Sequence, residues 1–108
     1  MKFTFEFIGT FITGLFYASP ILIFLILLIA GLGQMIGRSE GWNKVDSLYY
    51  AFITATTVGY GDFRPAHNFG KLFSIIIALF GLLLTGIVVA LGVEAATIAF
   101  KSIYMANP

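Results

Sequence analysis

The residues best suited to do chemistry in this chain form a short run, 57–61, in which glycine occupies alternate positions. The run reads Thr57, Val58, Gly59, Tyr60 and Gly61. Backbone carbonyls are neutral oxygen ligands, and a row of them can replace the water around a cation. To turn successive carbonyls toward one axis, the backbone must alternate between ordinary and left-handed conformations, which the two glycines adopt at little cost. The run therefore predicts a carbonyl site for cations. The Thr57 hydroxyl adds an oxygen, and Val58 and Tyr60 pack behind the run.

The composition of the chain places this run in a membrane protein. The sequence is 59% hydrophobic and 10% charged, whereas soluble domains are about a quarter charged. The uncharged stretches 7–37 and 72–93 both reach the roughly 20 residues that a membrane helix needs. We expect an all-α membrane protein with two transmembrane helices and lipid around them. A net charge of +1 gives no reason to expect nucleic acid, and the absence of cysteine excludes disulfides and thiolate sites.

The first apolar stretch is too long for a single crossing. A helix over residues 7–37 would extend about 46 Å, against a hydrocarbon core of about 30 Å. We therefore expect an interfacial segment, 1–14, followed by an outer helix at about 15–36. Places where the helix could break are Gly9, Gly14 and Pro20. The aromatic face expected at the interface consists of Phe3, Phe7 and Phe11.

A short amphipathic segment lies between the two spans. Residues 44–56 have a helical pattern, which Asn43 can cap and Asp46 can complete as a capping box. The segment is too short to span and too aromatic for a solvated loop, so it predicts a re-entrant helix buried in protein. Its C-terminal end carries partial negative charge, which favours a cation nearby. An inner helix is expected at about 69–100, followed by a tail at 101–108.

Residues 54–62, flanked by a short helix and two spans, resemble the pore domain of the tetrameric potassium channels. The sequence of 57–61 is the known selectivity-filter sequence of those channels. The resemblance covers roughly residues 15–100 and is closest in size to the prokaryotic two-transmembrane members. One strand of carbonyls cannot encircle an ion, so several copies must surround an axis. The resemblance implies that there are four, in a four-fold homotetramer. It also implies potassium as the transported ion, with no cofactor, bound at Thr57, Val58, Gly59 and Tyr60.

The resemblance assigns supporting roles next to the filter. Asp62 would lie at the outer mouth, hydrogen-bonded to an aromatic side chain of the pore helix, where Tyr49 and Tyr50 occupy positions that are commonly Trp. A structural clamp is favoured over direct ion binding for Asp62. Ile53 departs from some bacterial relatives, which have a glutamate there that pairs with the aspartate after the filter. Filter inactivation based on that pair is therefore not expected.

The inner helix carries four further candidates. Gly81 stands twenty residues after Gly61, where related inner helices often have a gating hinge. Close helix packing is the alternative, because small residues let helices approach. Thr85, Val89 and Glu94 are candidates for the inner cavity. Glu94 could instead mark where the helix leaves the bilayer. In the outer turn, His67 is expected to be solvated, with proton sensing as the alternative.

The resemblance implies a multi-pass protein of the cell membrane with both termini in the cytoplasm. The count of basic residues opposes this orientation, because the linker has more of them than the two ends. We give more weight to the direction of the filter. No arginine-rich sensor helix is present. A cytoplasmic regulatory domain could have been removed after the inner helix or could never have existed, so the gating stimulus is left open.

Two other functions compete with a selective potassium channel. A nonselective cation channel of the same fold usually departs from the filter sequence at the tyrosine, and Tyr60 is present. A passive membrane anchor or assembly subunit would need only the two spans, and it leaves the filter and the re-entrant helix unexplained. An enzyme is not expected, since the linker lacks a nucleophile and base pair and the glycines lack the lysine of a phosphate loop.

Overall fold

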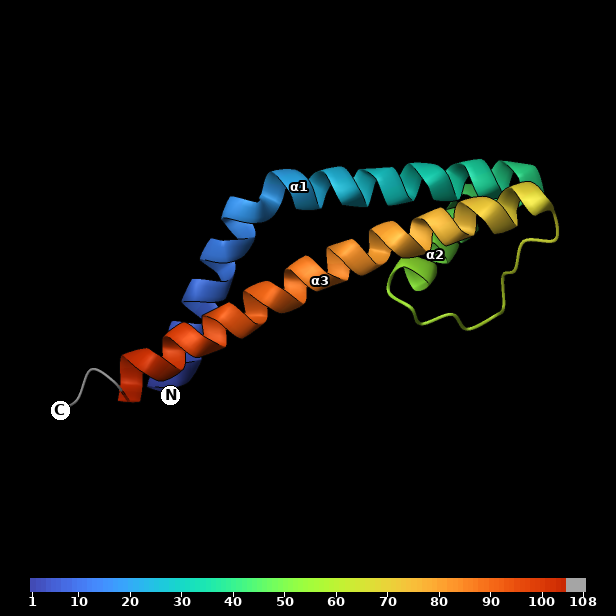
Figure 1. Cartoon of the computed structure of the whole chain (residues 1–108). Coiled ribbons are helices and arrows are strands. Elements are labelled where there is room, and N and C mark those ends of the chain that lie inside the picture. The colour runs from blue at the N-terminus through green and yellow to red at the C-terminus, as the bar shows by residue number, and fades with distance from the viewer. Residues whose placement is uncertain (105–108) are drawn as a thin grey trace. The chain divides into compact units, whose positions relative to one another are not determined.

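The described part of the chain, residues 1–104 of a computed structural model, is built from three helices. These are α1 (Lys2–Glu40), α2 (Lys44–Ala55) and α3 (Asn68–Tyr104), as Figure 1 shows. No strand occurs within residues 1–104. Helices α1 and α3 are both long and apolar enough to cross a membrane. The prediction of an all-α protein with two transmembrane helices and a short helix between them is confirmed.

Contacts within the chain define two compact units, which are described separately. Unit 1 contains Met1–Ile21 and the chain from Gly86 onward, and unit 2 contains Leu22–Thr85. In unit 1 the start of α1 and the end of α3 run antiparallel (Figure 1). A Cβ at Gly14 would lie 3.1 Å from Leu91 Cδ2, and one at Gly92 would lie 3.8 Å from Phe11 Cε1.

Helix α1 continues through all the predicted break points. The boundary expected at residue 14 is therefore not a helix end, and the helix does not begin at about residue 15. Pro20 has no N–H to bond the Phe16 carbonyl four residues earlier. The Ser19 hydroxyl donates to that carbonyl instead, at 2.7 Å. A replacement donor of this kind keeps a proline inside a helix where water is scarce.

The expected aromatic face of the N-terminal segment is present. The rings of Phe3 and Phe7 stack with centroids 6.3 Å apart, and those of Phe7 and Phe11 stack at 5.7 Å. Phe11, the last of the three rings, lies close to Gly92 of α3. This end of the face therefore packs against protein, while the interfacial position of the segment stays a prediction.

Helix α3 is longer than expected, because it begins at Asn68 and continues to Tyr104. The first four residues of the predicted tail, 101–104, are therefore helical. The rest of that tail lies outside the described residues. Ala95 and Ala99 are buried, which is consistent with small side chains at the contact with α1 in unit 1.

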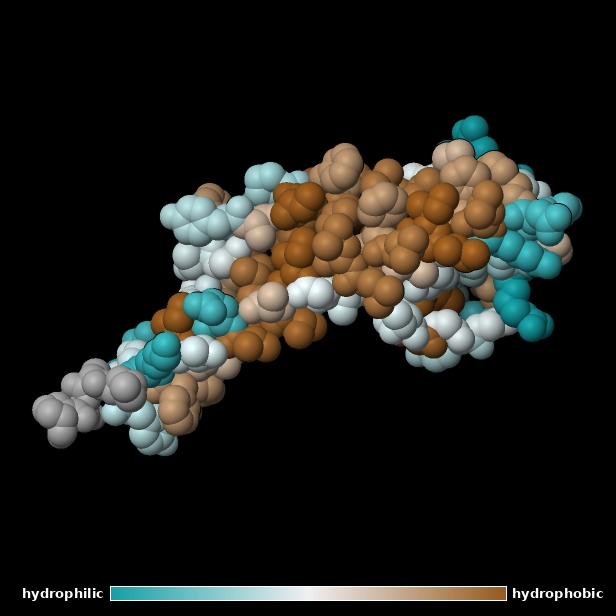
Figure 2. Space-filling model, in the orientation of Figure 1, coloured by the Kyte–Doolittle hydropathy of each residue, from teal (hydrophilic) through white to brown (hydrophobic). Residues whose placement is uncertain are grey.

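Unit 2 holds α2 between the second half of α1 and the first half of α3. Its core is formed by buried side chains from all three helices: Ile29, Ile36, Tyr50, Ala51, Ala55 and Ile77. In Figure 2 hydrophobic surface covers the middle of this unit. Hydrophilic surface gathers where α1 ends and α3 begins. This distribution suits a unit whose sides face lipid and whose end faces water.

Glycines on α1 let α2 approach closely. A Cβ at Gly33 would lie 3.0 Å from the Ser47 carbonyl oxygen and would also crowd Ala51. A Cβ at Gly37 would overlap Ser47 Oγ and would lie 2.6 Å from Ser47 Cβ. The two glycines are one helical turn apart, and so are Ser47 and Ala51. The α1–α2 contact is therefore a crossing of two small-residue faces.

Candidate functional site

The start of α2 is fixed by hydrogen bonds from its own cap and from α1. The Asn43 side chain accepts from the Asp46 N–H at 2.7 Å, so the predicted cap is confirmed. The Ser47 hydroxyl donates to the Asn43 carbonyl at 2.8 Å. No return bond from the Asp46 carboxylate completes a capping box in residues 1–104. From α1, Gln34 Nε2 donates to the Lys44 carbonyl at 3.0 Å.

In the candidate filter, which follows α2, the backbone dihedral angle φ alternates in sign from residue to residue. Positive φ occurs at Thr57 (64°), Gly59 (56°) and Gly61 (84°). The residues between them keep ordinary φ. This is the alternation that the glycine spacing predicts, with Thr57 as the one position that is not glycine. A left-handed conformation at such a residue costs of order 1–3 kcal/mol and persists only where surrounding structure enforces it.

Hydrogen bonds to the last turn of α2 hold the first residues of the candidate filter. The Thr57 N–H donates to the Thr54 carbonyl at 3.2 Å, and the Gly59 N–H donates to the Ile53 carbonyl at 3.1 Å. The Thr57 hydroxyl donates to the Thr56 carbonyl at 2.6 Å. Because that bond uses the hydroxyl proton, the Thr57 oxygen keeps its lone pairs for a cation. The end of α2 and the filter thus form one hydrogen-bonded structure.

The two larger filter side chains are exposed in the single chain. Val58 is 50% exposed and Tyr60 is 73% exposed. The expectation that they pack behind the filter stays a prediction, because it concerns a pore built from several copies of the chain. A Cβ at Gly59 or Gly61 would meet nothing within 4 Å. The need for glycine at these two positions therefore comes from φ and not from crowding.

Asp62 and Tyr49 lie together beside the filter. Hydrogen bonding to the Asp62 carboxylate raises the pKa of the Tyr49 hydroxyl above its ordinary value, with desolvation and the carboxylate charge acting in the same direction. The hydroxyl is therefore kept protonated as a donor. The Phe63 N–H also donates to Asp62 Oδ1, at 3.2 Å. The carboxylate is held by these donors, which suits a clamp.

The second candidate tyrosine has a different partner. The Tyr50 hydroxyl lies 2.6 Å from Ser74 Oγ on α3, and Tyr50 is buried. The expectation that Tyr50 shares in binding Asp62 is therefore wrong, because its side chain points from α2 toward α3. Its ring still belongs to an aromatic cluster at the outer side of α2, formed by Trp42, Tyr49, Tyr50 and Phe63.

Gly81 lies directly against the end of α2. A Cβ at this position would overlap the carbonyl oxygen and Cα of Ala55 and would lie 2.6 Å from its carbonyl carbon. A Cβ at Gly86, five residues further along α3, would meet nothing within 4 Å. Close packing against α2 therefore accounts for glycine at position 81. The hinge role stays a prediction that this contact does not require.

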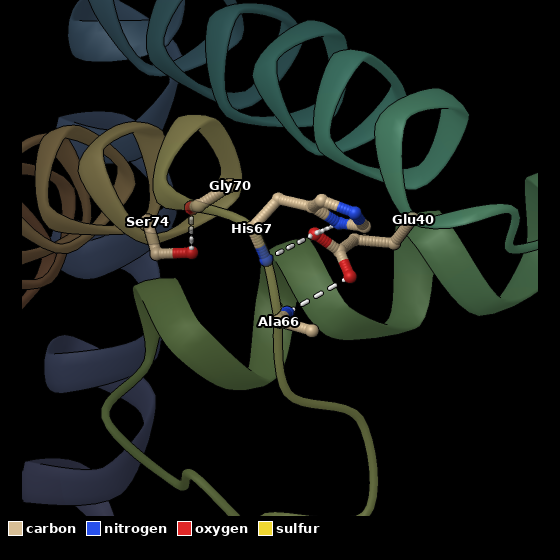
Figure 3. A network of polar contacts seen from close by, with 5 residues as sticks. All are labelled: Glu40, Ala66, His67, Gly70 and Ser74. Atoms are coloured by element: carbon tan, nitrogen blue, oxygen red, sulfur yellow. Dashed lines mark hydrogen bonds and ion pairs between the residues drawn. The ribbon is translucent and has the colours of Figure 1, made fainter.

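Glu40, which we did not single out from the sequence, joins the end of α1 to the start of α3. Its Oε1 accepts from the Ala66 N–H at 2.9 Å, and its Oε2 accepts from the His67 N–H at 3.0 Å (Figure 3). The His67 ring nitrogen Nδ1 lies 2.9 Å from Oε2. The Glu40 side chain is 5% exposed, whereas that of His67 is 67% exposed. A carboxylate surrounded by donors at a helix N-terminus is stabilised in its charged form.

The α1 end that presents this carboxylate has a defined turn. Gly41 has a φ of 80°, and the Trp42 N–H donates to the Gly37 carbonyl at 2.9 Å. This is the geometry of a Schellman motif, in which glycine takes the left-handed position after the helix. The sequence signal for it was a glycine just after a charged helix end. Nothing in the local sequence indicated that the Glu40 carboxylate would bond to Ala66 and His67 at the start of α3.

The remaining candidates of the inner helix lie on its surface. Thr85, Val89 and Glu94 are all exposed in the single chain. Their place in a cavity stays a prediction, because a cavity on the pore axis would need further copies of the chain. His67 is largely solvated, as expected, although its ring also touches Glu40.

The comparisons with known proteins identify the family. The profile of the family described as "Ion channel" matches residues 3–98. Human "Potassium channel subfamily K member 10" is 34% identical over 76 residues, which is 69% of this chain and 14% of that protein. "Potassium channel protein 1" of Methanocaldococcus jannaschii is 42% identical over 59 residues, which is 55% of this chain and 17% of that protein.

A third relative, human "Potassium channel subfamily K member 5", is 42% identical over 45 residues, which is 38% of this chain and 9% of that protein. The chain thus spans less than a fifth of the length of these three relatives. No solved structure matches it significantly. The resemblance to a potassium-channel pore domain is confirmed, and the chain, a membrane protein with two spanning helices, belongs to the ion-channel family.

Proposed function

We propose that this chain is the pore-forming subunit of a potassium-selective channel that conducts passively across the cell membrane as a homotetramer. Potassium ions would bind in turn to the carbonyls of residues 57–60 and to the Thr57 hydroxyl. The observation that carries the proposal is the alternation of φ at residues 57, 59 and 61, just after a short helix that packs one face into the core of unit 2. These relatives are all named as potassium channels, which supports potassium as the ion.

The exposure of the filter side chains supports assembly. Val58 and Tyr60 are apolar or aromatic, and both are at least half exposed in the single chain. One strand of carbonyls also leaves most of an ion uncovered. Four copies around an axis would supply the missing ligands and could bury these side chains. An even number of spans places both termini on one side of the membrane, which we propose to be the cytoplasm.

Ion selectivity tests this function most directly. Purified protein in a planar bilayer, with potassium on one side and sodium on the other, should give a reversal potential near the potassium equilibrium value. A reversal potential near zero with clear current would identify a nonselective cation channel of the same fold. Absence of both current and barium-sensitive potassium flux from loaded vesicles would favour a passive assembly subunit.

A matched pair of variants tests whether the filter backbone is responsible. Gly59→Ala and Gly86→Ala both add a Cβ where nothing lies within 4 Å, but only Gly59 has positive φ (56°). The left-handed conformation costs an alanine about 1–2 kcal/mol. We expect Gly59→Ala to lose potassium selectivity or current while Gly86→Ala keeps both. Equal behaviour of the two variants would contradict a filter at 57–61.

A further inference from the structure

A buried hydrogen bond connects the pore helix to the inner helix at Tyr50 and Ser74. The two oxygens are 2.6 Å apart, and Tyr50 is only 7% exposed. The Ser74 hydroxyl also donates to the Gly70 carbonyl at 2.6 Å, a bond visible in Figure 3. A serine hydroxyl has one proton, so its oxygen must accept the proton of the tyrosine. The direction is therefore fixed, from Tyr50 to Ser74 to the Gly70 carbonyl.

Two close contacts join α2 to α3 on either side of the core residue Ile77, and this bond is the first of them. The second is the contact of Gly81 with the Ala55 backbone. On α3 the two points are seven residues apart, or about 10 Å, and on α2 they are five residues apart, or about 7 Å. Two separated points fix both the position of α2 along α3 and the angle between them. Without the hydrogen bond, the Gly81 contact and the apolar packing around Ile77 would remain, but apolar packing is non-directional and would hold the angle of α2 less rigidly.

The candidate filter is attached to the C-terminal end of α2, which these two contacts hold against α3. Ala55 is the last residue of α2, and the Gly59 N–H donates to the Ile53 carbonyl in the same turn. A change in the angle of α2 would therefore move the filter backbone. Carbonyl oxygens replace the water around an ion only where their positions suit that ion, so small movements would alter selectivity.

We infer that Tyr50 and Ser74 are positioning residues for ion selection. Their hydrogen bond holds α2 at the angle that keeps the carbonyls of residues 57–60 aligned, and it transmits displacements of α3 between Gly70 and Gly81 to the filter. Neither side chain touches the ion. The inference rests on the proposed potassium-selective function. It assigns to Tyr50 a task different from that of its neighbour Tyr49, which holds Asp62.

The test removes the hydroxyls without removing the packing. Tyr50→Phe keeps the ring against Trp42, whose centroid is 5.0 Å away, and Ser74→Ala keeps the helix. The sodium-to-potassium permeability ratio is measured in bilayers for both single variants and for the double variant. It is also measured for Ser74→Thr, which keeps a hydroxyl at position 74. Tyr17→Phe is the control for loss of an exposed tyrosine hydroxyl. Thr97→Ala is the control for loss of a hydroxyl bonded only within α3.

We expect the sodium-to-potassium permeability ratio to rise about fivefold in each single variant. This is the factor that corresponds to the net free energy of one intramolecular hydrogen bond. The double variant should rise no further than either single variant, because both remove the same bond. Ser74→Thr and the two controls should resemble the wild type. If Tyr50→Phe fails to assemble, the comparison of Ser74→Ala with Ser74→Thr gives the same test.

Two outcomes would overturn the inference. One is an unchanged ratio in both single variants, whether or not the tetramer is less stable, which would reduce the pair to a structural contact. The other is independent effects that multiply in the double variant. A wild-type channel without selectivity would instead overturn the proposed function, so the two failures are distinguishable by measuring the wild type first.

Discussion

Gly81 of α3 and Ala55 of α2 are in backbone contact, so close that a side chain at position 81 would occupy the space of the Ala55 carbonyl. Ala55 ends α2, and only Thr56 separates it from the candidate filter. The same glycine was a candidate hinge for the inner helix. The two roles make different predictions, because a hinge needs backbone freedom whereas a contact needs only the absence of a Cβ.

We predict that Gly81→Ala weakens the fold and the filter together. The added methyl group must push α2 and α3 apart, and overpacking of this kind typically costs about 1–3 kcal/mol. Thermal melting of the purified protein and bilayer current from the same preparation would measure both effects. Gly86→Ala is the control, since its Cβ meets nothing, and alanine should favour the helix by up to about 1 kcal/mol. A Gly81→Ala protein of normal stability whose open probability alone changes would favour the hinge.

We predict that Gly37→Ala disrupts the contact between α1 and α2. The new Cβ would overlap Ser47, whereas Gly31→Ala, on the same helix, would place its Cβ in open space. Thermal unfolding should show a clear loss of stability for Gly37→Ala and none for Gly31→Ala. Adding Ser47→Gly to Gly37→Ala should recover part of the loss, because it removes the overlapping atoms. No recovery would mean that the damage does not arise from this contact.

The parts of the fold that local patterns govern could be predicted from the sequence. Two apolar stretches gave the long helices, Asn43 marked the start of α2, and the alternate glycines marked the positive φ values at 59 and 61. In each case the physical cause lies within a few residues. The continuity of α1 through Pro20 was missed because it depends on a replacement hydrogen bond, from the Ser19 hydroxyl to the Phe16 carbonyl. Such a bond leaves no distinctive pattern in the sequence.

Relationships between distant residues could not be predicted in this way. Tyr49 and Tyr50 are adjacent, so on a helix they point about 100° apart, and only packing decides that one binds Asp62 and the other Ser74, 24 residues away. Gly81 and Gly86 are alike in sequence, and only the presence of α2 distinguishes them. A stronger signal was available at Gly33 and Gly37, whose spacing in an apolar helix is typical of close packing.

We predict that Glu40 protects the start of α3 from opening. Its carboxylate accepts from the N–H groups of Ala66 and His67. In Glu40→Gln the amide nitrogen must face one of these donors, which leaves it without an acceptor. Hydrogen exchange should become faster at the N–H of Ala66 or His67 that loses its acceptor, and thermal melting should shift to lower temperature. His67→Gln, which removes only the ring contact, should leave the exchange of Ala66 unchanged. Equal protection in Glu40→Gln and wild type would contradict this role.

We predict an alkaline transition that depends on Tyr49. Because the Asp62 carboxylate raises the pKa of this hydroxyl, the protonated form is favoured in the folded protein. The resulting stabilisation is fully present below the ordinary tyrosine pKa of about 10, and it is lost as the external pH rises through the raised value. Current measured as the external pH increases should therefore decline above pH 10 or so. The decline reflects repulsion between a phenolate and Asp62.

Tyr49→Phe separates this effect from other alkaline changes. The variant lacks both the donor and the titrating group, so its current should be lower than that of the wild type near neutral pH and should not show the Tyr49-dependent decline. Tyr17→Phe, which removes an exposed hydroxyl far along α1 from this site, should titrate like the wild type. An identical alkaline decline in Tyr49→Phe and wild type would show that Tyr49 does not control the outer mouth through Asp62.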